Sequence, residues 1–334
     1  MDLPSLIANL QSLRALSLRG CSRLKSVPPL GKLKNLRVVD VFDTGIKEVP
    51  QGMENLVKLK VLDMGGIDLH ELPKEILTKL SQLQYLHLPI RVNAPIEDLA
   101  SFELLEEFGG RFCDLHNFHK FMSSHHNYEK DWWYTIFVGQ VNFDSGLDDG
   151  IPKQRRVIVG DCAIEAGGGE AATSIFLPRG IDILKIRSCH GLSSCFVDNF
   201  LSWTTSLRGL TCEINDCDDI EWIINWSSGR DTTTDPHCIS FRSLIVRDLQ
   251  NLVVLCKGKI ASHTFSGLTE LVTHNCNRMK LLFPRAILQD LKNLEKLGVA
   301  WCSQYRYETH IHLIVKACNA KNRDTLGVFL TLSI

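Results

Sequence analysis

A leucine spacing recurs at nearly constant intervals through the first third of the chain. The central anchors of this pattern, Leu16, Val39, Leu62 and Leu86, are 23, 23 and 24 residues apart. This is the period of a leucine-rich repeat, in which each repeat contributes one short strand to a parallel sheet. The sequence therefore predicts an α/β solenoid with a parallel concave β-sheet and short helical or irregular convex segments. Such solenoids present extended concave binding surfaces, which favours protein recognition over catalysis.

The pattern continues less regularly toward the C-terminus, with spacings that rise to 32 residues. Further strands are expected at 105–108, 134–138, 156–159, 181–186, 212–214, 241–246, 268–271 and 294–299, which gives about twelve in all. Leu115, Phe118 and Phe121 have helical spacing and predict one convex helix. By repeat style the chain divides into regular repeats at 1–108, degenerate repeats with longer loops at 109–180, cysteine-type repeats at 181–302 and a non-repeat tail at 303–334.

Seven of the twelve cysteines fall five residues after a central anchor, at the Asn/Cys position of the repeat. The chain turns inward there, and Cys fits as a compact, mostly apolar side chain with a weak S–H donor. We therefore expect these thiols to be structural, buried and reduced. They are Cys21, Cys113, Cys162, Cys189, Cys217, Cys276 and Cys302.

Side chains alternate along a strand, so the neighbours of the buried anchors should face the concave surface. Their mixture of charge and scattered aromatic rings suits a protein-binding surface, where aromatic and Arg side chains tend to be the anchors. The candidate binding residues are Arg19, Asp40, Phe42, Asp63, Tyr85, His87, Lys185, Arg187, Glu213, Asn215, Arg247, Glu270, His274, Lys296 and Trp301.

Other function classes find little support in the sequence. The formal net charge is −1, so no basic surplus points to nucleic acid. No apolar run reaches the roughly 18 residues that cross a bilayer, and the N-terminus does not resemble a signal peptide, so we expect a cytoplasmic protein. The glycines at 167–169 lack the Lys-Ser/Thr of a phosphate-binding loop, and His116, His119, His125 and His126 have no partners at a metal-site spacing. We expect no enzyme activity, no metal and no cofactor.

Two repeat styles occur together in this chain. Val27-Pro28, Val49-Pro50 and Leu72-Pro73 mark the early repeats, whereas Leu184-Lys185-Ile186-Arg187-Ser188-Cys189 represents the later ones. Over residues 1–302 this combination resembles the leucine-rich-repeat region of plant intracellular nucleotide-binding disease-resistance receptors, the coiled-coil class in particular. The resemblance implies recognition of a pathogen effector or a guarded host protein, and contact with a nucleotide-binding domain that is thereby held inactive.

The resemblance leaves alternatives open. The chain contains no nucleotide-binding domain, and Met1 lies almost inside a repeat, so we expect a receptor fragment or a truncated gene product, functional or not. Plant F-box proteins also carry cysteine-ended repeats, so a substrate-binding domain of a ubiquitin-ligase adaptor is the second hypothesis. An adaptor would show F-box helices near its N-terminus, where residues 1–40 already form repeats.

Overall fold

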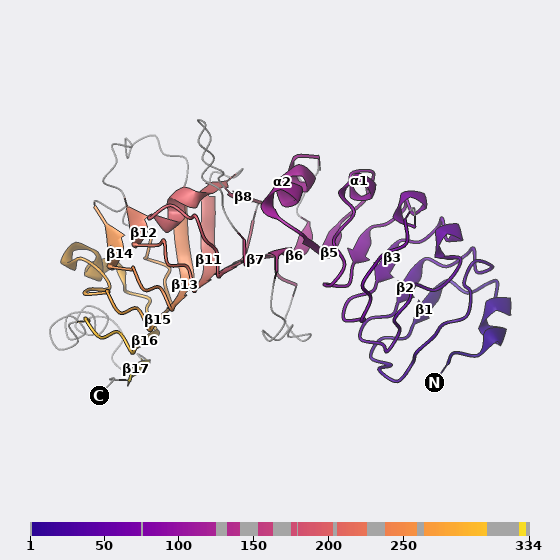
Figure 1. Cartoon of the computed structure of the whole chain (residues 1–334), viewed down its shortest axis with the longest axis horizontal. Helices are drawn as coiled ribbons and strands as arrows, with labels where there is room; N and C mark the ends of the chain where they lie inside the picture. The colour runs from indigo at the N-terminus through magenta and orange to yellow at the C-terminus, as the bar shows by residue number, and fades with distance from the viewer. Residues whose placement is uncertain are drawn as a thin grey trace. The chain divides into compact units, whose positions relative to one another are not determined.

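The computed structural model describes residues 2–74, 76–124, 132–140, 153–162, 175–178, 180–202, 206–225, 238–258, 264–305 and 327–331. The chain forms two compact units, unit 1 with Met1–Gly139 and Asp148–Gln154, and unit 2 with Gln140–Leu147 and Arg155–Ile334. In each unit, successive turns of the chain add strands to a parallel sheet, and short helices or strands lie on the opposite side (Figure 1). The predicted α/β leucine-rich-repeat solenoid is confirmed.

Unit 1 has one parallel sheet in which the strands follow chain order. Its strands are β1 (Ala15–Ser17), β2 (Val38–Asp40), β3 (Val61–Asp63), β4 (Tyr85–His87), β5 (Glu107–Phe112) and β6 (Trp133–Gly139). Its convex segments are the 3₁₀ helices η1 (Ser5–Asn9), η2 (Met53–Asn55) and η3 (Leu77–Lys79) and the α-helices α1 (Ile96–Leu99) and α2 (Leu115–Ser124). The predicted convex helix is α2, in which Phe118 and Phe121 are fully buried against the sheet.

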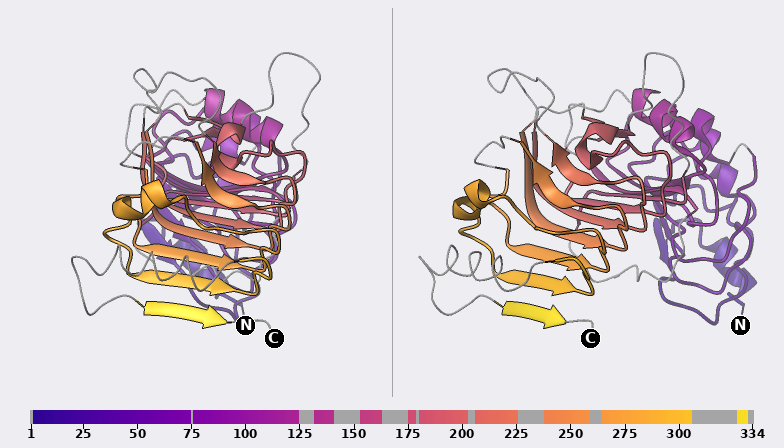
Figure 2. Two further views of the ribbon diagram at one scale, coloured as in Figure 1. Left: turned by 90° about the vertical axis from the view of Figure 1, so that its left-hand side faces the viewer. Right: turned by 60° about the vertical axis from the view of Figure 1, so that its left-hand side comes forward.

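Unit 2 repeats the arrangement with longer strands, stacked in chain order (Figure 2). Its main sheet comprises β7 (Arg156–Gly160), β9 (Ile183–Arg187), β11 (Ser206–Asn215), β13 (Cys238–Arg247), β15 (Glu270–His274), β16 (Lys296–Ala300) and β17 (Gly327–Thr331). Two small sheets pair β8 (Ile175–Leu177) with β10 (Phe200–Ser202) and β12 (Trp222–Asn225) with β14 (Val254–Lys257), and 3₁₀ turns occupy Phe196–Asn199 and Arg285–Asp290.

The anchors explain why these strands form and stack. Leu16 pairs in register with Val39, Val39 with Leu62 and Leu62 with Leu86, and these side chains are at most 7% exposed. β9 and β15 each alternate buried and half-buried residues, as the anchor spacing predicts. All twelve predicted strands are present. The tail at 303–334 adds a thirteenth, because β17 pairs in parallel with β16.

Nine strands in the described residues are followed by a residue in the left-handed backbone region, four positions after the central anchor. Gly, Asn and Asp tolerate this conformation, whereas a bulky side chain there is an outlier. The series is Gly20, Asp43, Gly66, Asp161, Ser188, Asp216, Asp248, Asn275 and Trp301. Trp301, with φ of 53°, is the one bulky member of the series.

None of the helices within the described ranges is long and apolar enough to span a bilayer.

Candidate functional site

In each unit, the candidate binding residues lie on the exposed face of the strands or at the strand exits. In unit 1, a polar network runs across the strands from Arg19. The Arg19 guanidinium donates to Asp40 over 3.1 Å and to Asp63 over 2.6 Å, and it covers the Phe42 ring with 4.2 Å to the ring centroid. Tyr85 donates its hydroxyl to Asp63 over 3.3 Å. Most polar groups of this surface are therefore already paired within the chain.

The network continues through His87, whose Nδ1 lies 3.0 Å from the Tyr85 hydroxyl and whose Nε2 lies 3.5 Å from Glu107. Lys153 reaches the same Glu107 carboxylate over 2.6 Å. Burial lowers the pKa of His87 to about 4, against the attraction of Glu107. His87 is therefore neutral near pH 7, and it serves as a hydrogen-bonding link in this network without adding charge.

Burial also raises the pKa of Asp63, although the Gly65 backbone N–H and the Arg19 charge act in the opposite direction. Its carboxylate is 3% exposed and accepts from Gly65 over 3.0 Å. Asp63 therefore organises the strand exit and the network in unit 1 more than it offers a free charge to a partner.

In unit 2 the polar surface is centred on Glu213 in β11. Its carboxylate is 9% exposed and lies 2.9 Å from Lys185, 3.3 Å from Arg187 and 2.8 Å from Arg247. Burial raises the pKa of Glu213, but the hydrogen bond from Lys185 and the surrounding positive charges outweigh it and hold the pKa below its usual range. One buried carboxylate is thus ion-paired with three cationic side chains, two from β9 and one from β13.

A second carboxylate, Glu270, accepts from Lys296 over 2.5 Å and from Ser243 over 2.8 Å. On the exposed face of unit 2, these ion pairs thus bring four cationic side chains to two carboxylates. We call the four cations the cationic patch; they are Lys185, Arg187, Arg247 and Lys296. At the strand exits, Asp216 and Asp248 each accept a side-chain hydrogen bond from the neighbouring repeat.

Trp301 ends the exposed face of β16. Its side chain lies against His274, with 4.6 Å between ring centroids, while the residue stays 49% exposed. A left-handed backbone costs a residue with a Cβ about 1–2 kcal/mol. Residues held in such strained conformations cluster at binding sites. Trp301 is therefore an indole presented on the surface at a cost to folding.

The structure adds residues that the sequence analysis missed. Glu107 occupies the position just before the central anchor Phe108, so the alternation rule would have found it once that strand was aligned. Lys153 has no such signal, because it lies outside any strand and reaches Glu107 across 46 residues of sequence. Asn215 lies in β11 beside Arg187 and Arg247, and its side-chain oxygen is buried without a hydrogen-bond partner among the described residues.

Two known protein families match separate parts of the chain. Residues 1–123 match the family described as a leucine-rich repeat region, and residues 170–303 match that of plant disease resistance protein RPS2-like leucine-rich repeats. Both matches are to leucine-rich repeats, and residues 170–303 are similar to the repeats of plant disease resistance proteins. Leucine-rich-repeat domains generally bind proteins, and their fold is typically a non-enzymatic scaffold.

Individual relatives agree with this family. TMV resistance protein N of Nicotiana glutinosa is 42% identical over 89 residues, which are 26% of this chain and 8% of that protein. Disease resistance protein At4g27190 of Arabidopsis thaliana is 34% identical over 83 residues, 25% of this chain and 8% of that protein. The matched segments thus span less than a tenth of these relatives. Among solved structures, an internalin (inlF) from Listeria monocytogenes aligns with a TM-score of 0.48 at 13% identity, over 99% of this chain and 83% of that one.

The cysteines at the Asn/Cys position of the repeat follow one geometry in unit 2. Each thiol donates to the carbonyl oxygen two residues earlier, at 3.3–3.4 Å. Five of the seven predicted cysteines are buried in this way: Cys162, Cys189, Cys217, Cys276 and Cys302. The weak S–H donor thus satisfies a carbonyl group at the inward turn, as the repeat position predicts.

The predicted burial is wrong for Cys21 and Cys113, which are exposed. Cys21 follows the first strand of its sheet, β1, which has a neighbouring strand on one side only. Before Cys113, β5 runs on to Phe112, whose ring takes the buried place with 0% exposure. Cys113 then lies just before α2 and exchanges hydrogen bonds with Asp114 and Asn117.

Alkylation of the native chain should separate these two groups of thiols. We expect Cys21 to react fastest, with Cys113 slower because burial raises its pKa. The five buried cysteines should react at least about a hundredfold more slowly than Cys21, because each must wait for local opening of the sheet. Peptide mapping of the time course by mass spectrometry measures these rates. Equal rates for Cys21 and Cys217 would contradict the burial pattern.

Within the residues that the structure describes, no group of three or more His, Cys, Asp or Glu side chains is placed to hold a metal ion. His125, His126 and the glycines at 167–169, which the sequence analysis considered, lie outside those residues.

Proposed function

We propose that this chain is the partner-recognition part of a plant disease-resistance receptor, and that it binds an acidic surface of a protein through unit 2. The observation that carries the proposal is Trp301, an exposed indole in a strained backbone that directly follows β16 in the sheet that carries the cationic patch. Trp and Arg are the residue types that most often dominate the energy of protein interfaces.

The charge of the surface supports an acidic partner. Both carboxylates of these ion pairs, Glu213 and Glu270, are already bonded within the chain, and the four cations outnumber them. Carboxylates of a partner would complete the pairing, and Arg187 and Arg247 can each present two N–H groups to one carboxylate. Opposite charge also speeds the encounter of the two proteins.

In a longer receptor, we propose that the partner is a pathogen effector or a guarded host protein in the cytoplasm, and that the same surface contacts a nucleotide-binding domain in the resting state. The similarity to plant disease resistance proteins supports this role. The two ligands would compete for the cationic patch, so that capture of one releases the other.

Neutralising the two arginines tests the proposal. The tagged full chain is used to capture proteins from plant leaf extract, and the affinity of an identified partner is then measured by calorimetry. We expect Arg187→Gln and Arg247→Gln each to weaken binding about tenfold, because each removes a charged hydrogen bond of about 1.5 kcal/mol. Lys185 still pairs with Glu213 in both variants, and circular dichroism confirms that they fold.

The matched control is Lys280→Gln, which makes the same change of charge as either arginine variant at an exposed position outside the candidate face. This control should bind like the wild type. Binding to the wild type should also weaken as salt is raised, because exposed charge pairs are screened. A partner that binds the arginine variants as tightly as the wild type would refute the assignment of this face.

A further inference from the structure

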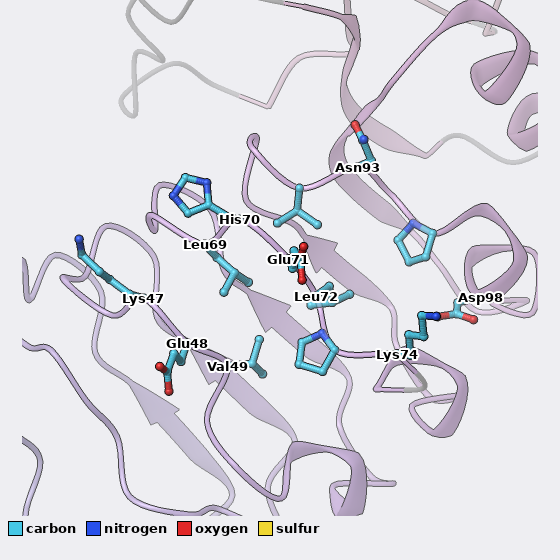
Figure 3. Close-up of a pocket in the computed structure, with 13 residues that line it drawn as sticks. Lys47, Glu48, Val49, Leu69, His70, Glu71, Leu72, Lys74, Asn93 and Asp98 are labelled. Atoms are coloured by element: carbon cyan, nitrogen blue, oxygen red, sulfur yellow. The ribbon is translucent and has the colours of Figure 1, made fainter.

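Unit 1 contains a groove on the side of the repeats away from the candidate binding residues. It has a volume of about 1280 Å³ and is lined by three stretches of chain: 47–49, 69–74, and Val92–Asn93 with Pro95 and Asp98. Figure 3 shows Val49, Leu69 and Leu72 surrounding the same space. Leu69 is buried, Val49 and Leu72 are half-buried, and Lys47, Glu48, His70, Glu71 and Lys74 on its rim are exposed.

The corresponding stretches of unit 2 form a second, smaller parallel sheet. About ten residues after the central anchor, Trp222 pairs with Val254, Ile224 with Cys256 and Asn225 with Lys257. Bridges extend the pairing on both sides, from Cys195 to Trp222 and from Val254 to Leu281. In unit 2, successive repeats are thus bonded to one another on both sides of the solenoid.

In unit 1 the equivalent stretches are not bonded to each other. Among the described residues, the backbone groups of 47–49 and 69–72 make no backbone hydrogen bond. Pro50 and Pro73 follow directly, and a proline cannot donate to a strand ladder. In the first repeat, the equivalent position is Ser26, and it does pair with an extended segment of the chain. Asp2 forms a bridge with Ser26, and the Leu3 N–H donates to the Ser26 carbonyl oxygen over 3.2 Å.

We propose that this groove binds an extended, uncharged peptide segment of a partner protein, which adds as a strand between residues 47–49 and 69–72. The peptide would supply the backbone hydrogen bonds that the neighbouring repeats lack, which is the principle of strand addition at an open edge. Because side chains of a strand alternate, every second residue would pack on Val49, Leu69 and Leu72.

The rim explains why the segment is uncharged. Lys47, His70 and Arg91 all lie within 4 Å of Asp68, at 3.6, 3.8 and 3.2 Å. The lining of the groove also carries two lysines against three carboxylates, so opposite charges nearly balance around it, unlike those of the cationic patch in unit 2. A bonded stretch of four residues is about 13 Å long at the rise of a β-strand.

Hydrogen exchange with a defined peptide tests this site. The probe is acetyl-Thr-Val-Thr-Val-Thr-amide at millimolar concentration, added to the full chain. We expect exchange of the amides in 47–49 and 69–72 to slow at least fivefold, because free N–H groups become bonded. Slowing elsewhere and not in these two stretches, or no slowing at all, would overturn the proposal.

Two comparisons separate strand addition from simple apolar contact. The same peptide with its backbone nitrogens methylated keeps the side chains but loses the donors, and it should bind at least tenfold more weakly. Val49→Asp should also weaken binding at least tenfold, whereas Val57→Asp, at a 53% exposed valine outside the groove, should not. Equal binding of the methylated peptide, or of V49D in a folded chain, would refute strand addition in this groove.

Discussion

Replacing Trp301 by asparagine is expected to make unit 2 more stable and, at the same time, a poorer binder. Asn tolerates the left-handed backbone that Trp301 adopts at φ of 53°, and Asn275 already holds the equivalent position in the preceding repeat. Relief of strain of about 1–2 kcal/mol should exceed the loss of the half-exposed contact with His274. We therefore expect a gain of about 1 kcal/mol, measured by hydrogen exchange of β15 and β16 in the full chain.

Binding should change in the opposite direction. An indole that acts as an interface hot spot contributes about 2 kcal/mol or more, so we expect the affinity for a captured partner to fall at least about thirtyfold. Trp301→Phe keeps an aromatic ring and should retain most of the affinity. The reverse change one repeat earlier, Asn275→Trp, should cost about 1–2 kcal/mol of stability.

These outcomes separate two roles of the residue. If Trp301 mainly stabilised the last repeat through His274, W301N would be less stable than the wild type. If it is presented for binding, stability rises while affinity falls. A variant that is destabilised and still binds with unchanged affinity would contradict the functional assignment.

The strands could be predicted because their information is local. An apolar anchor every 23 or 24 residues can be satisfied only by stacked, buried strands, and Leu16, Val39, Leu62 and Leu86 do stack in register. β17 was not predicted, because the sequence before it has no repeat pattern. Its residue Val328 pairs with Leu297, which lies 31 residues earlier in the chain. Regular spacing therefore fixes the sheet but not where it ends.

The binding surface was less predictable, and its role in recognition is still a prediction. Alternation places Lys185, Arg187 and Glu213 on one face, but it does not reveal that one buried carboxylate gathers three cations from β9 and β13. Nor does it show that the indole of Trp301 occupies a strained position. Both features depend on distances between repeats, which are set by packing and not by the local sequence.

Replacing Glu213 by alanine should cost unit 2 about 3 kcal/mol, because removal of one partner of a buried ion pair leaves charges without compensation. Lys185, Arg187 and Arg247 would then face one another without the carboxylate that lies within 3.3 Å of each. Hydrogen exchange of β9, β11 and β13 measures the loss in the full chain. The matched control is Glu270→Ala, which breaks a pair with a 51% exposed lysine and should cost less than about 1 kcal/mol.

The stability that unit 2 loses when Glu213 is replaced should depend on pH. The pKa of Glu213 is held below its ordinary value of 4.5, because its hydrogen bond from Lys185 and the three cations outweigh burial. A lowered pKa in the folded state means that the stabilisation is fully present above about pH 4.5 and disappears as the pH falls through the folded value. The difference in stability between wild type and E213A should therefore be larger at pH 7 than in acid. A difference that stays constant down to pH 2 would mean that the glutamate stabilises unit 2 through packing and not through its charge.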